Sequence, residues 1–182
     1  MFRAQLRPDL YLRLLEERHA PTVFALVNRD REFLTEWLPW VESTRREEDT
    51  ASFIRASLEQ FASNSGFAAG VWWNEQFVGV IGTHKIDWLN RKVELGYWLG
   101  RDSQGHGIMT DACRAAVTHL LVEMDLNRVV IQCATGNVKS CAIPRRLGFA
   151  LEGTARDGQL LGGRYQDLLM FSMLRRDWKP CS

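Results

Sequence analysis

The stretch that decides the fold is Gln104-Gly105-His106-Gly107-Ile108-Met109-Thr110. It lies between a predicted strand that ends at Leu99 and a predicted helix. Gly105 and Gly107 allow a tight turn that gathers successive amide groups at one point, and the helix adds the positive end of its dipole. The stretch lacks the Gly-Lys-Ser/Thr of a P-loop, and Thr110 stands where a GxGxxG motif has glycine. It therefore indicates either a phosphate-binding loop without a lysine or a glycine-rich connection without a ligand.

Hydrophobic periodicity on either side of this stretch predicts alternating helices and strands. Helices are predicted over residues 20–38 (divided near Asp30 and ended by Pro39), 47–63, 108–124 and 140–147. Strands are predicted over residues 10–15, 67–73, 77–86, 93–99, 129–134, 150–156 and 166–174. The helical crossover between residues 99 and 129 joins strands that must run parallel. The pattern predicts an α/β (α+β) fold with a mixed, mostly antiparallel sheet of about seven strands.

Length and composition predict one globular domain over residues 1–182. The 182 residues are 46% hydrophobic and 25% charged, which excludes a disordered or collagen-like chain. Lys and Arg number 23 and Asp and Glu number 22, so the net charge is +1. This balance predicts no direct binding to nucleic acid or to an anionic membrane. No run of about 18 apolar residues is present to cross a bilayer.

The cysteines give information about metals and location. Cys113, Cys133, Cys141 and Cys181 are scattered, without a CxxC pair or a histidine cluster nearby. This spacing argues against a zinc site, and no metal is predicted. The first residues lack the apolar segment of an export signal. Scattered thiols without such a signal indicate a cytoplasmic protein.

Several short motifs occur in the order and spacing of one superfamily. They are residues 104–109, Glu94-Leu95-Gly96-Tyr97-Trp98-Leu99, Asn137 with Ser140, and Leu147-Gly148-Phe149. The first resembles the Q/R-x-x-G-x-G/A acyl-CoA loop of the GNAT superfamily of N-acetyltransferases, although Met109 replaces its last Gly or Ala. The others resemble the E-[IL]-G-Y-W-[IL] pattern, the Asn-x-x-Ser step and the Leu/Ile-Gly-Phe helix end of the ribosomal-protein-serine N-terminal acetyltransferase (RimJ/RimL-type) branch. That branch also carries the replacement at the last loop position, and the resemblance extends over nearly the whole chain.

The resemblance implies a GNAT fold in which helices flank the sheet and the fourth and fifth strands, residues 93–99 and 129–134, splay apart. Acetyl-CoA is then the donor cosubstrate, with its pyrophosphate on the loop amides and its pantetheine arm in the splay. Amides near Trp98 and Leu99 would stabilise the oxyanion. The implied coenzyme-binding residues are Trp98, Leu99, Gln104, Gly105, His106, Gly107, Ile108, Met109, Thr110, Asn137 and Ser140. Acetyl transfer is direct, so no cysteine acts as a nucleophile.

Glu94 is the candidate base that deprotonates the acceptor amine, directly or through water. A carboxylate in an otherwise apolar strand is partly desolvated, which makes it a better proton acceptor. The alternative is a surface residue in a salt bridge with its neighbours Arg91 or Lys92. His84 is a lesser candidate base, and a satisfied core histidine is the more common state of such a residue.

Ser140 is the candidate for stabilising the departing thiolate by a hydrogen bond. Many GNAT enzymes use a tyrosine here, but the only later tyrosine, Tyr165, is predicted to lie in a hairpin. The alternative for Ser140 is an N-cap of the following helix. Asn137 is expected to contact the pantetheine arm or to serve as a turn or cap. His106 is expected to point to solvent and contribute its amide.

The resemblance makes the acceptor a primary amine, most favourably the N-terminal α-amino group of a ribosomal protein. An α-amine has a pKa of ~7.7–8.0 against ~10.4 for lysine, so a modest base suffices. The alternatives are a small amine (polyamine, amino acid or aminoglycoside) and a non-catalytic acyl-CoA-binding module. A homodimer is also expected, because it is common in the superfamily. The resemblance implies that the aromatic segment from Phe33 to Trp40 walls the acceptor groove, and core packing is the alternative. Arg145 and Arg146 are expected to be solvated helix charges, with contact to the adenosine-phosphate end of the coenzyme as the alternative.

Overall fold

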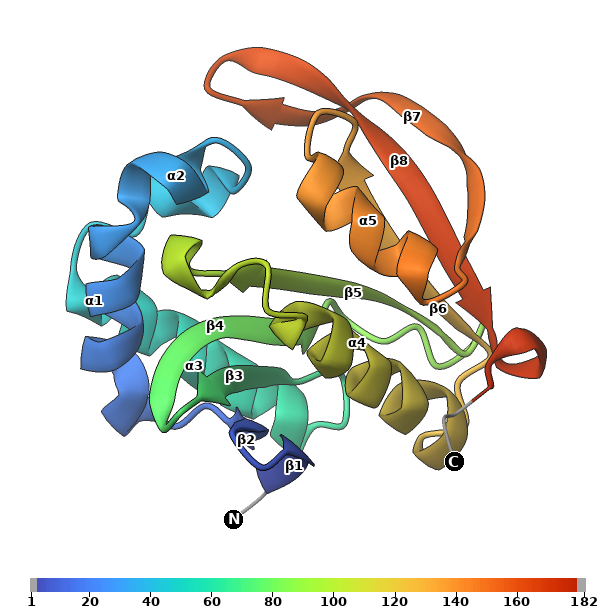
Figure 1. Cartoon of the computed structure of the whole chain (residues 1–182), viewed down its shortest axis with the longest axis horizontal. Helices are drawn as coiled ribbons and strands as arrows, with labels where there is room; N and C mark the ends of the chain where they lie inside the picture. Colours follow the sequence, from blue (N-terminus) through green and yellow to red (C-terminus); the bar gives the residue numbers. More distant parts are fainter. Residues whose placement is uncertain (1–2, 180–182) are drawn as a thin grey trace.

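The fold is built on one twisted sheet of eight strands (Figure 1). The computed structural model describes residues 3–179. The strands are β1 (Arg3–Arg7), β2 (Leu10–Leu14), β3 (Ala68–Trp73), β4 (Gln76–Thr83), β5 (Lys92–Leu99), β6 (Arg128–Ala134), β7 (Ala150–Leu161) and β8 (Arg164–Leu174). Their spatial order is β1-β2-β3-β4-β5-β6-β8-β7, and only β5 and β6 pair in parallel. The predicted mixed, mostly antiparallel sheet is confirmed.

The eighth strand, β1, was not predicted from the sequence. It is a mostly exposed edge strand with charged residues at both ends, so the alternation of a half-buried strand is absent. Pro8 follows it directly and indicates a loop. The strands of the β7–β8 hairpin are also longer than predicted. Both continue to the turn at Gly162 and Gly163, whereas the predicted strands left residues 157–165 outside any strand.

Within the described residues, five α-helices flank the sheet. They are α1 (Ala20–Arg29), α2 (Arg31–Thr35), α3 (Glu47–Ala62), α4 (Ile108–Thr118) and α5 (Val138–Arg146). Asp30 separates α1 from α2 as predicted, but α2 ends at Thr35, before the predicted stop at Pro39, which begins a short 3-10 helix instead. Within residues 3–179, no helix has both the length and the apolar character needed to cross a membrane.

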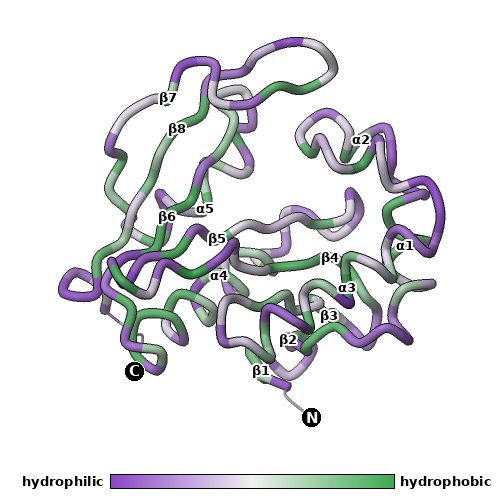
Figure 2. The backbone as a smooth tube through the Cα atoms, turned by 180° about the vertical axis from the view of Figure 1, so that it is seen from behind, coloured by the Kyte–Doolittle hydropathy of each residue, from purple (hydrophilic) through white to green (hydrophobic). Residues whose placement is uncertain are grey.

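Two apolar clusters cover opposite faces of the sheet. Adjacent residues of β4 divide between them: Val80 joins the cluster with α1 and α3, whereas Ile81 joins the cluster with α4. This division follows from the alternation of side chains along a strand. Figure 2 shows the resulting concentration of hydrophobic residues along the inner strands and of hydrophilic residues at the periphery.

The parallel strands β5 and β6 separate after a short paired segment. Only Lys92–Arg128, Val93–Val129 and Glu94–Val130 are in register. Beyond Glu94, β5 stays paired with β4 and β6 stays paired with β8. We call the resulting opening, between residues 95–99 and 131–134, the wedge. The predicted splay is therefore confirmed.

Candidate active site

The glycine-rich loop connects β5 to α4 as predicted. Gly105 and Gly107 have φ angles of +84° and +74°, which L side chains rarely adopt, and Gly107 is the N-cap of α4. The first amides of a helix have no intrahelical acceptor. Among the described residues, Asp111 is the first of this turn whose amide has a backbone acceptor, the Gly107 carbonyl at 3.1 Å. The preceding amides are thus available to an anionic group.

A cavity of about 1060 Å³ extends from this loop, along the end of β5 and the start of α5, to α2. Its walls include nearly every residue that the resemblance implies for coenzyme binding: Trp98, Leu99, Gln104, Gly105, Gly107, Ile108, Met109, Thr110, Asn137 and Ser140. A β-carbon added to Gly105 or Gly107 would meet no atom within 4 Å, so the loop borders open space. The residues implied for coenzyme binding therefore line one continuous cavity, with a single exception.

His106 is that exception, because it does not line the cavity. Its ring packs against Trp73, with ring centroids 4.7 Å apart, and its carbonyl accepts a hydrogen bond from Arg7 at 3.3 Å. The residue remains exposed, as expected, but its ring lies on the protein surface rather than free in solvent. Trp73 and its neighbour Trp72 pack on opposite faces of the sheet, as the alternation of a strand requires.

Two basic side chains of α5 reach the loop. Lys139 donates a hydrogen bond to the Gln104 side chain at 2.8 Å, and Arg146 donates one to the Thr110 hydroxyl at 3.0 Å. Both line the cavity. For Arg146 a solvated charge was favoured over a contact with the coenzyme, and Lys139 was not singled out, because nothing local in the sequence shows that α5 packs beside this loop.

The register of β4 and β5 shows that the Trp98 and Leu99 amides, both expected to stabilise an oxyanion, point in opposite directions. The Gly100 amide donates to Val78 and the His84 amide donates to Glu94, so the pair Val80–Trp98 between them is also hydrogen-bonded. The Trp98 amide therefore points toward β4. The Leu99 amide points the other way, into the wedge, and Trp98 lines the cavity with its other atoms.

Ser140 lies in the first turn of α5, close to Tyr97 of β5 and Cys133 of β6. The cap of this helix is Asn137, whose side-chain oxygen accepts the Ser140 amide at 3.0 Å. The suggestion that Ser140 itself caps the helix is therefore wrong, and the helix begins at Val138, two residues earlier than predicted. The Ser140 hydroxyl is 3.3 Å from the Cys133 sulfur and 3.5 Å from the Tyr97 hydroxyl.

Tyr97 is a residue that the sequence analysis missed at this point. Its hydroxyl donates to the Ser140 carbonyl at 3.1 Å, and it lines the same cavity. Burial raises the pKa of the Tyr97 phenol well above its ordinary value, and burial raises the pKa of the Cys133 thiol to about 11. Both groups are therefore protonated near neutral pH. They position Ser140 rather than act as nucleophiles.

Glu94 lies at the apex of the wedge, on the face opposite α4. Its neighbours Val93 and Leu95 are buried under α4, so alternation directs the carboxylate to the other face. The Gln132 amide donates to it at 2.8 Å, and the His84 ring lies 3.7 Å away. The side chain is 34% exposed and does not border the cavity.

The neighbours of Glu94 differ from those that the sequence suggested. Arg91 pairs with Asp125 and Lys92 pairs with Asp87, so neither forms a salt bridge with Glu94. The expectation that His84 is a core histidine is wrong, because its side chain is 70% exposed. Thr83 ends β4, and the three residues after it lie outside any strand.

The expected aromatic wall is present on the α2 side. Phe33, Trp37 and Leu38 line the cavity, and Trp40 packs on Trp98 with ring centroids 5.8 Å apart. Glu36 also lines the cavity and is exposed. Together with Asp111, it is a carboxylate of the cavity that the sequence analysis did not single out.

Residues 9–150 match the acetyltransferase (GNAT) domain family. The chain belongs to this family. It is 38% identical to a putative ribosomal N-acetyltransferase, YdaF of Bacillus subtilis, over 98% of each chain. It is 28% identical to the ribosomal-protein-serine acetyltransferase of Escherichia coli, over 91% of this chain and 93% of that one.

A solved GNAT structure places coenzyme A on the same fold. This is RimL, a ribosomal L7/L12 α-N-protein acetyltransferase, in complex with coenzyme A joined to a cysteine by a disulfide. It superposes with a TM-score of 0.92 at 28% identity and covers 95% of this chain and 98% of its own. The GNAT chain described here is accordingly an acyl-CoA-dependent N-acetyltransferase with acetyl-CoA as its donor.

Proposed function

We propose that this GNAT enzyme acetylates the N-terminal α-amino group of a protein, with a ribosomal protein as the acceptor. The observation that carries the proposal is that the chain aligns over nearly its whole length with relatives named as ribosomal N-acetyltransferases. The open face at Glu94 supports it, because a chain terminus needs only a surface groove that ends at the wedge. Its α-amine also loses its proton more readily than a lysine side chain does.

In this proposal the loop binds the donor diphosphate and the wedge receives the pantetheine arm. The amides of residues 105–110 face the phosphates, and Lys139 and Arg146 add positive charge at the same rim. The thioester then lies between β5 and β6, near the Leu99 amide. A backbone amide directed at the developing oxyanion typically contributes ~2.7–4 kcal/mol to catalysis.

Glu94 and Ser140 carry the proton and the leaving group in this scheme. Glu94 takes a proton from the incoming ammonium through an ordered water, since it stands outside the cavity. The free amine attacks the thioester carbonyl and a C–N bond forms. The nitrogen then releases its second proton to solvent as the C–S bond breaks. The Ser140 hydroxyl donates a hydrogen bond to the departing thiolate. A serine hydroxyl is too weak an acid to give up its proton readily, so the thiolate takes its proton from solvent.

The test is acetyl transfer from acetyl-CoA to a set of amines. The set contains peptides that differ only at residue one, the same peptides with a blocked N-terminus and an internal lysine, and a polyamine, an amino acid and an aminoglycoside. Thiol release gives the rate, and mass spectrometry locates the acetyl group. We expect turnover on free N-termini and a dependence on residue one.

Each other outcome contradicts a different part of the proposal. Preferred transfer to a small amine would replace the protein acceptor. Stabilisation of the fold by acetyl-CoA without transfer to any amine would indicate a binding module. Binding at 100 times Kd corresponds to ~2.7 kcal/mol of added stability, which is visible as a raised Tm.

We further propose that the enzyme acts in the cytoplasm as a homodimer. Ribosomal protein N-termini are accessible there during synthesis, and the absence of a membrane-spanning helix within residues 3–179 agrees with this. Light scattering measures the mass of the native protein, and a monomer at working concentration would contradict the dimer.

A further inference from the structure

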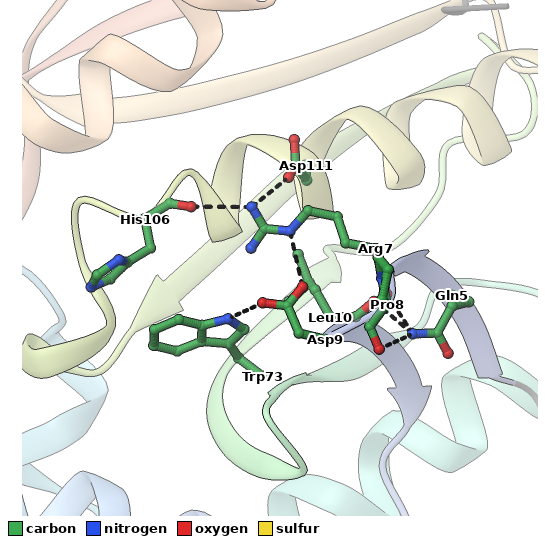
Figure 3. A network of polar contacts seen from close by, with 8 residues as sticks. All are labelled: Gln5, Arg7, Pro8, Asp9, Leu10, Trp73, His106 and Asp111. Carbon is green, nitrogen blue, oxygen red and sulfur yellow. Dashed lines mark hydrogen bonds and ion pairs between the residues drawn. The ribbon is translucent and has the colours of Figure 1, made fainter.

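The coenzyme loop is supported from behind by the turn between β1 and β2. Figure 3 shows the side chains of this turn, Arg7 and Asp9, directed toward the loop and the start of α4. Gln5 shapes the turn by donating to the carbonyls of Pro8 and Leu10. The contact between Arg7 and His106 joins residues about one hundred positions apart in the sequence.

Arg7 is the centre of this network. One terminal nitrogen, Nη1, donates to the His106 carbonyl at 3.3 Å and lies 3.4 Å from a carboxylate oxygen of Asp111. Its Nε lies 3.5 Å from the Asp9 carboxylate. The Arg7 side chain is only 33% exposed, so these ionic contacts are partly shielded from solvent.

A second path leads from the turn to the same loop. The Trp73 indole donates to the Asp9 carboxylate at 2.6 Å, and the Trp73 ring packs on His106. The turn thus holds His106 twice, through its carbonyl and through its ring (Figure 3). This is why the His106 side chain turns away from the cavity while its neighbours Gly105 and Gly107 line it.

Asp111 gives the network a function beyond support. It lies in the first turn of α4 and lines the cavity on which the donor diphosphate is proposed to bind. An unpaired carboxylate there repels a phosphate, and it offsets the attraction of the helix amides. Arg7 approaches Asp111 from the side of β1 and neutralises this charge without itself lining the cavity.

We propose that Arg7 is a positioning residue for donor binding: it neutralises Asp111 and fixes the loop at His106, so that the loop is preorganised for a diphosphate. The inference rests on the proposed placement of the diphosphate at residues 104–110. It assigns to the N-terminal edge strand a part in donor affinity, which the loop motif alone does not reveal.

The test compares Arg7→Met with the matched variant Arg3→Met. Arg3 lies on the same strand, but its partners are Glu75 and the Tyr11 ring, away from the loop. The Kd of acetyl-CoA is measured by calorimetry, which needs no acceptor. We expect Arg7→Met to raise Kd roughly tenfold, equivalent to about 1.4 kcal/mol, and Arg3→Met to leave it unchanged. In turnover assays, KM for acetyl-CoA rises while kcat at saturating donor is retained.

A double variant separates charge compensation from general damage to the fold. Asp111→Asn removes the charge that Arg7 compensates, so Arg7→Met with Asp111→Asn is expected to recover most of the lost affinity. Arg7→Lys, which keeps the charge, is expected to lose less than Arg7→Met. Wild-type affinity in Arg7→Met, or weak binding that Asp111→Asn does not restore, would overturn the inference. If wild-type protein binds no acetyl-CoA, the proposed function fails instead.

Discussion

The donor and acceptor sides of the wedge are built in different ways. In the proposed mechanism the donor side consists of backbone amides at the start of α4, where Ile108 and Met109 are buried with 1% and 5% exposure. On the acceptor side, Glu94 is a third exposed and is positioned by the Gln132 and His84 side chains. Backbone geometry supported by a core is hard to alter by single substitutions, whereas side chains on an open face change readily. We therefore expect the fold to fix the choice of donor and a few side chains to determine the choice of acceptor.

The largest effect is expected on the acceptor side, from Glu94→Gln. Loss of a general base typically lowers kcat by roughly 10²–10⁴-fold, because the amine then stays protonated. The Kd of acetyl-CoA should not change, since Glu94 does not line the cavity. Steady-state kinetics and calorimetry on the same variant measure the two quantities separately.

Glu36→Gln is the matched control for this variant. Glu36 is another carboxylate near the wedge, and unlike Glu94 it lines the cavity, as Asp111 also does. We expect its kcat to stay within about threefold of wild type, a change that mutation of an exposed residue commonly produces. A large loss in Glu36→Gln with near-normal turnover in Glu94→Gln would transfer the role of base to Glu36.

The next effect is expected from Ser140→Ala, which lies between the two sides. A hydrogen bond to a charged group contributes ~1.5–3 kcal/mol, so kcat should fall by roughly ten- to a hundredfold. Helix α5 keeps its cap, because that role belongs to Asn137. Asn137→Ala should instead lower the free energy of unfolding by ~1 kcal/mol. Normal turnover in Ser140→Ala would remove its hydroxyl from the mechanism.

On the donor side, Gly107→Val should weaken acetyl-CoA binding. The φ of +74° costs a β-branched residue ~1–2 kcal/mol, so the free loop relaxes and must be strained again on binding. Kd is expected to rise by roughly 5- to 30-fold. Gly162→Val is the control, since Gly162 also has a positive φ, +54°, but lies in the β7–β8 turn. Equal losses of affinity in both variants would show that the effect is not local.

The smallest effect is expected on the stability of the fold at low pH, and it comes from Glu152 on β7. Hydrogen bonds from Arg128 and Ser172 lower the pKa of Glu152 from 4.5 to about 2. A depressed pKa stabilises the fold above the ordinary value, and this contribution is lost as pH falls from about 4.5 toward 2. In Glu152→Gln, the free energy of unfolding should therefore fall less between pH 4.5 and pH 2 than it does in wild type. An identical pH dependence in wild type and variant would contradict the assignment.

The donor side could be predicted from the sequence because its signals are local. Two glycines before an amphipathic helix specify the loop, and the Asn137–Ser140 spacing places both residues in one helical turn. The crossover between residues 99 and 129 predicted the parallel pair, and the resemblance to GNAT enzymes implied the wedge between its strands. Met109 occupies the last loop position while its side chain is buried in the core.

The remaining features depend on contacts between distant segments. Lys139, Tyr97 and Gln132 act across gaps between separate elements, and no periodicity or motif shows such pairs. His84 was expected in the core because the strand was extended past Thr83. The edge strand β1 lacks an apolar pattern, so its support of the loop through Arg7 becomes visible only in the folded chain.

The central claim is tested most directly by a crystal structure of the enzyme with coenzyme A bound. The account predicts that the diphosphate oxygens accept hydrogen bonds from amides of residues 105–110. It also predicts that the sulfur lies between β5 and β6 within reach of the Ser140 hydroxyl. Coenzyme bound elsewhere, or a wedge filled by the enzyme's own side chains while the coenzyme is present, would contradict it.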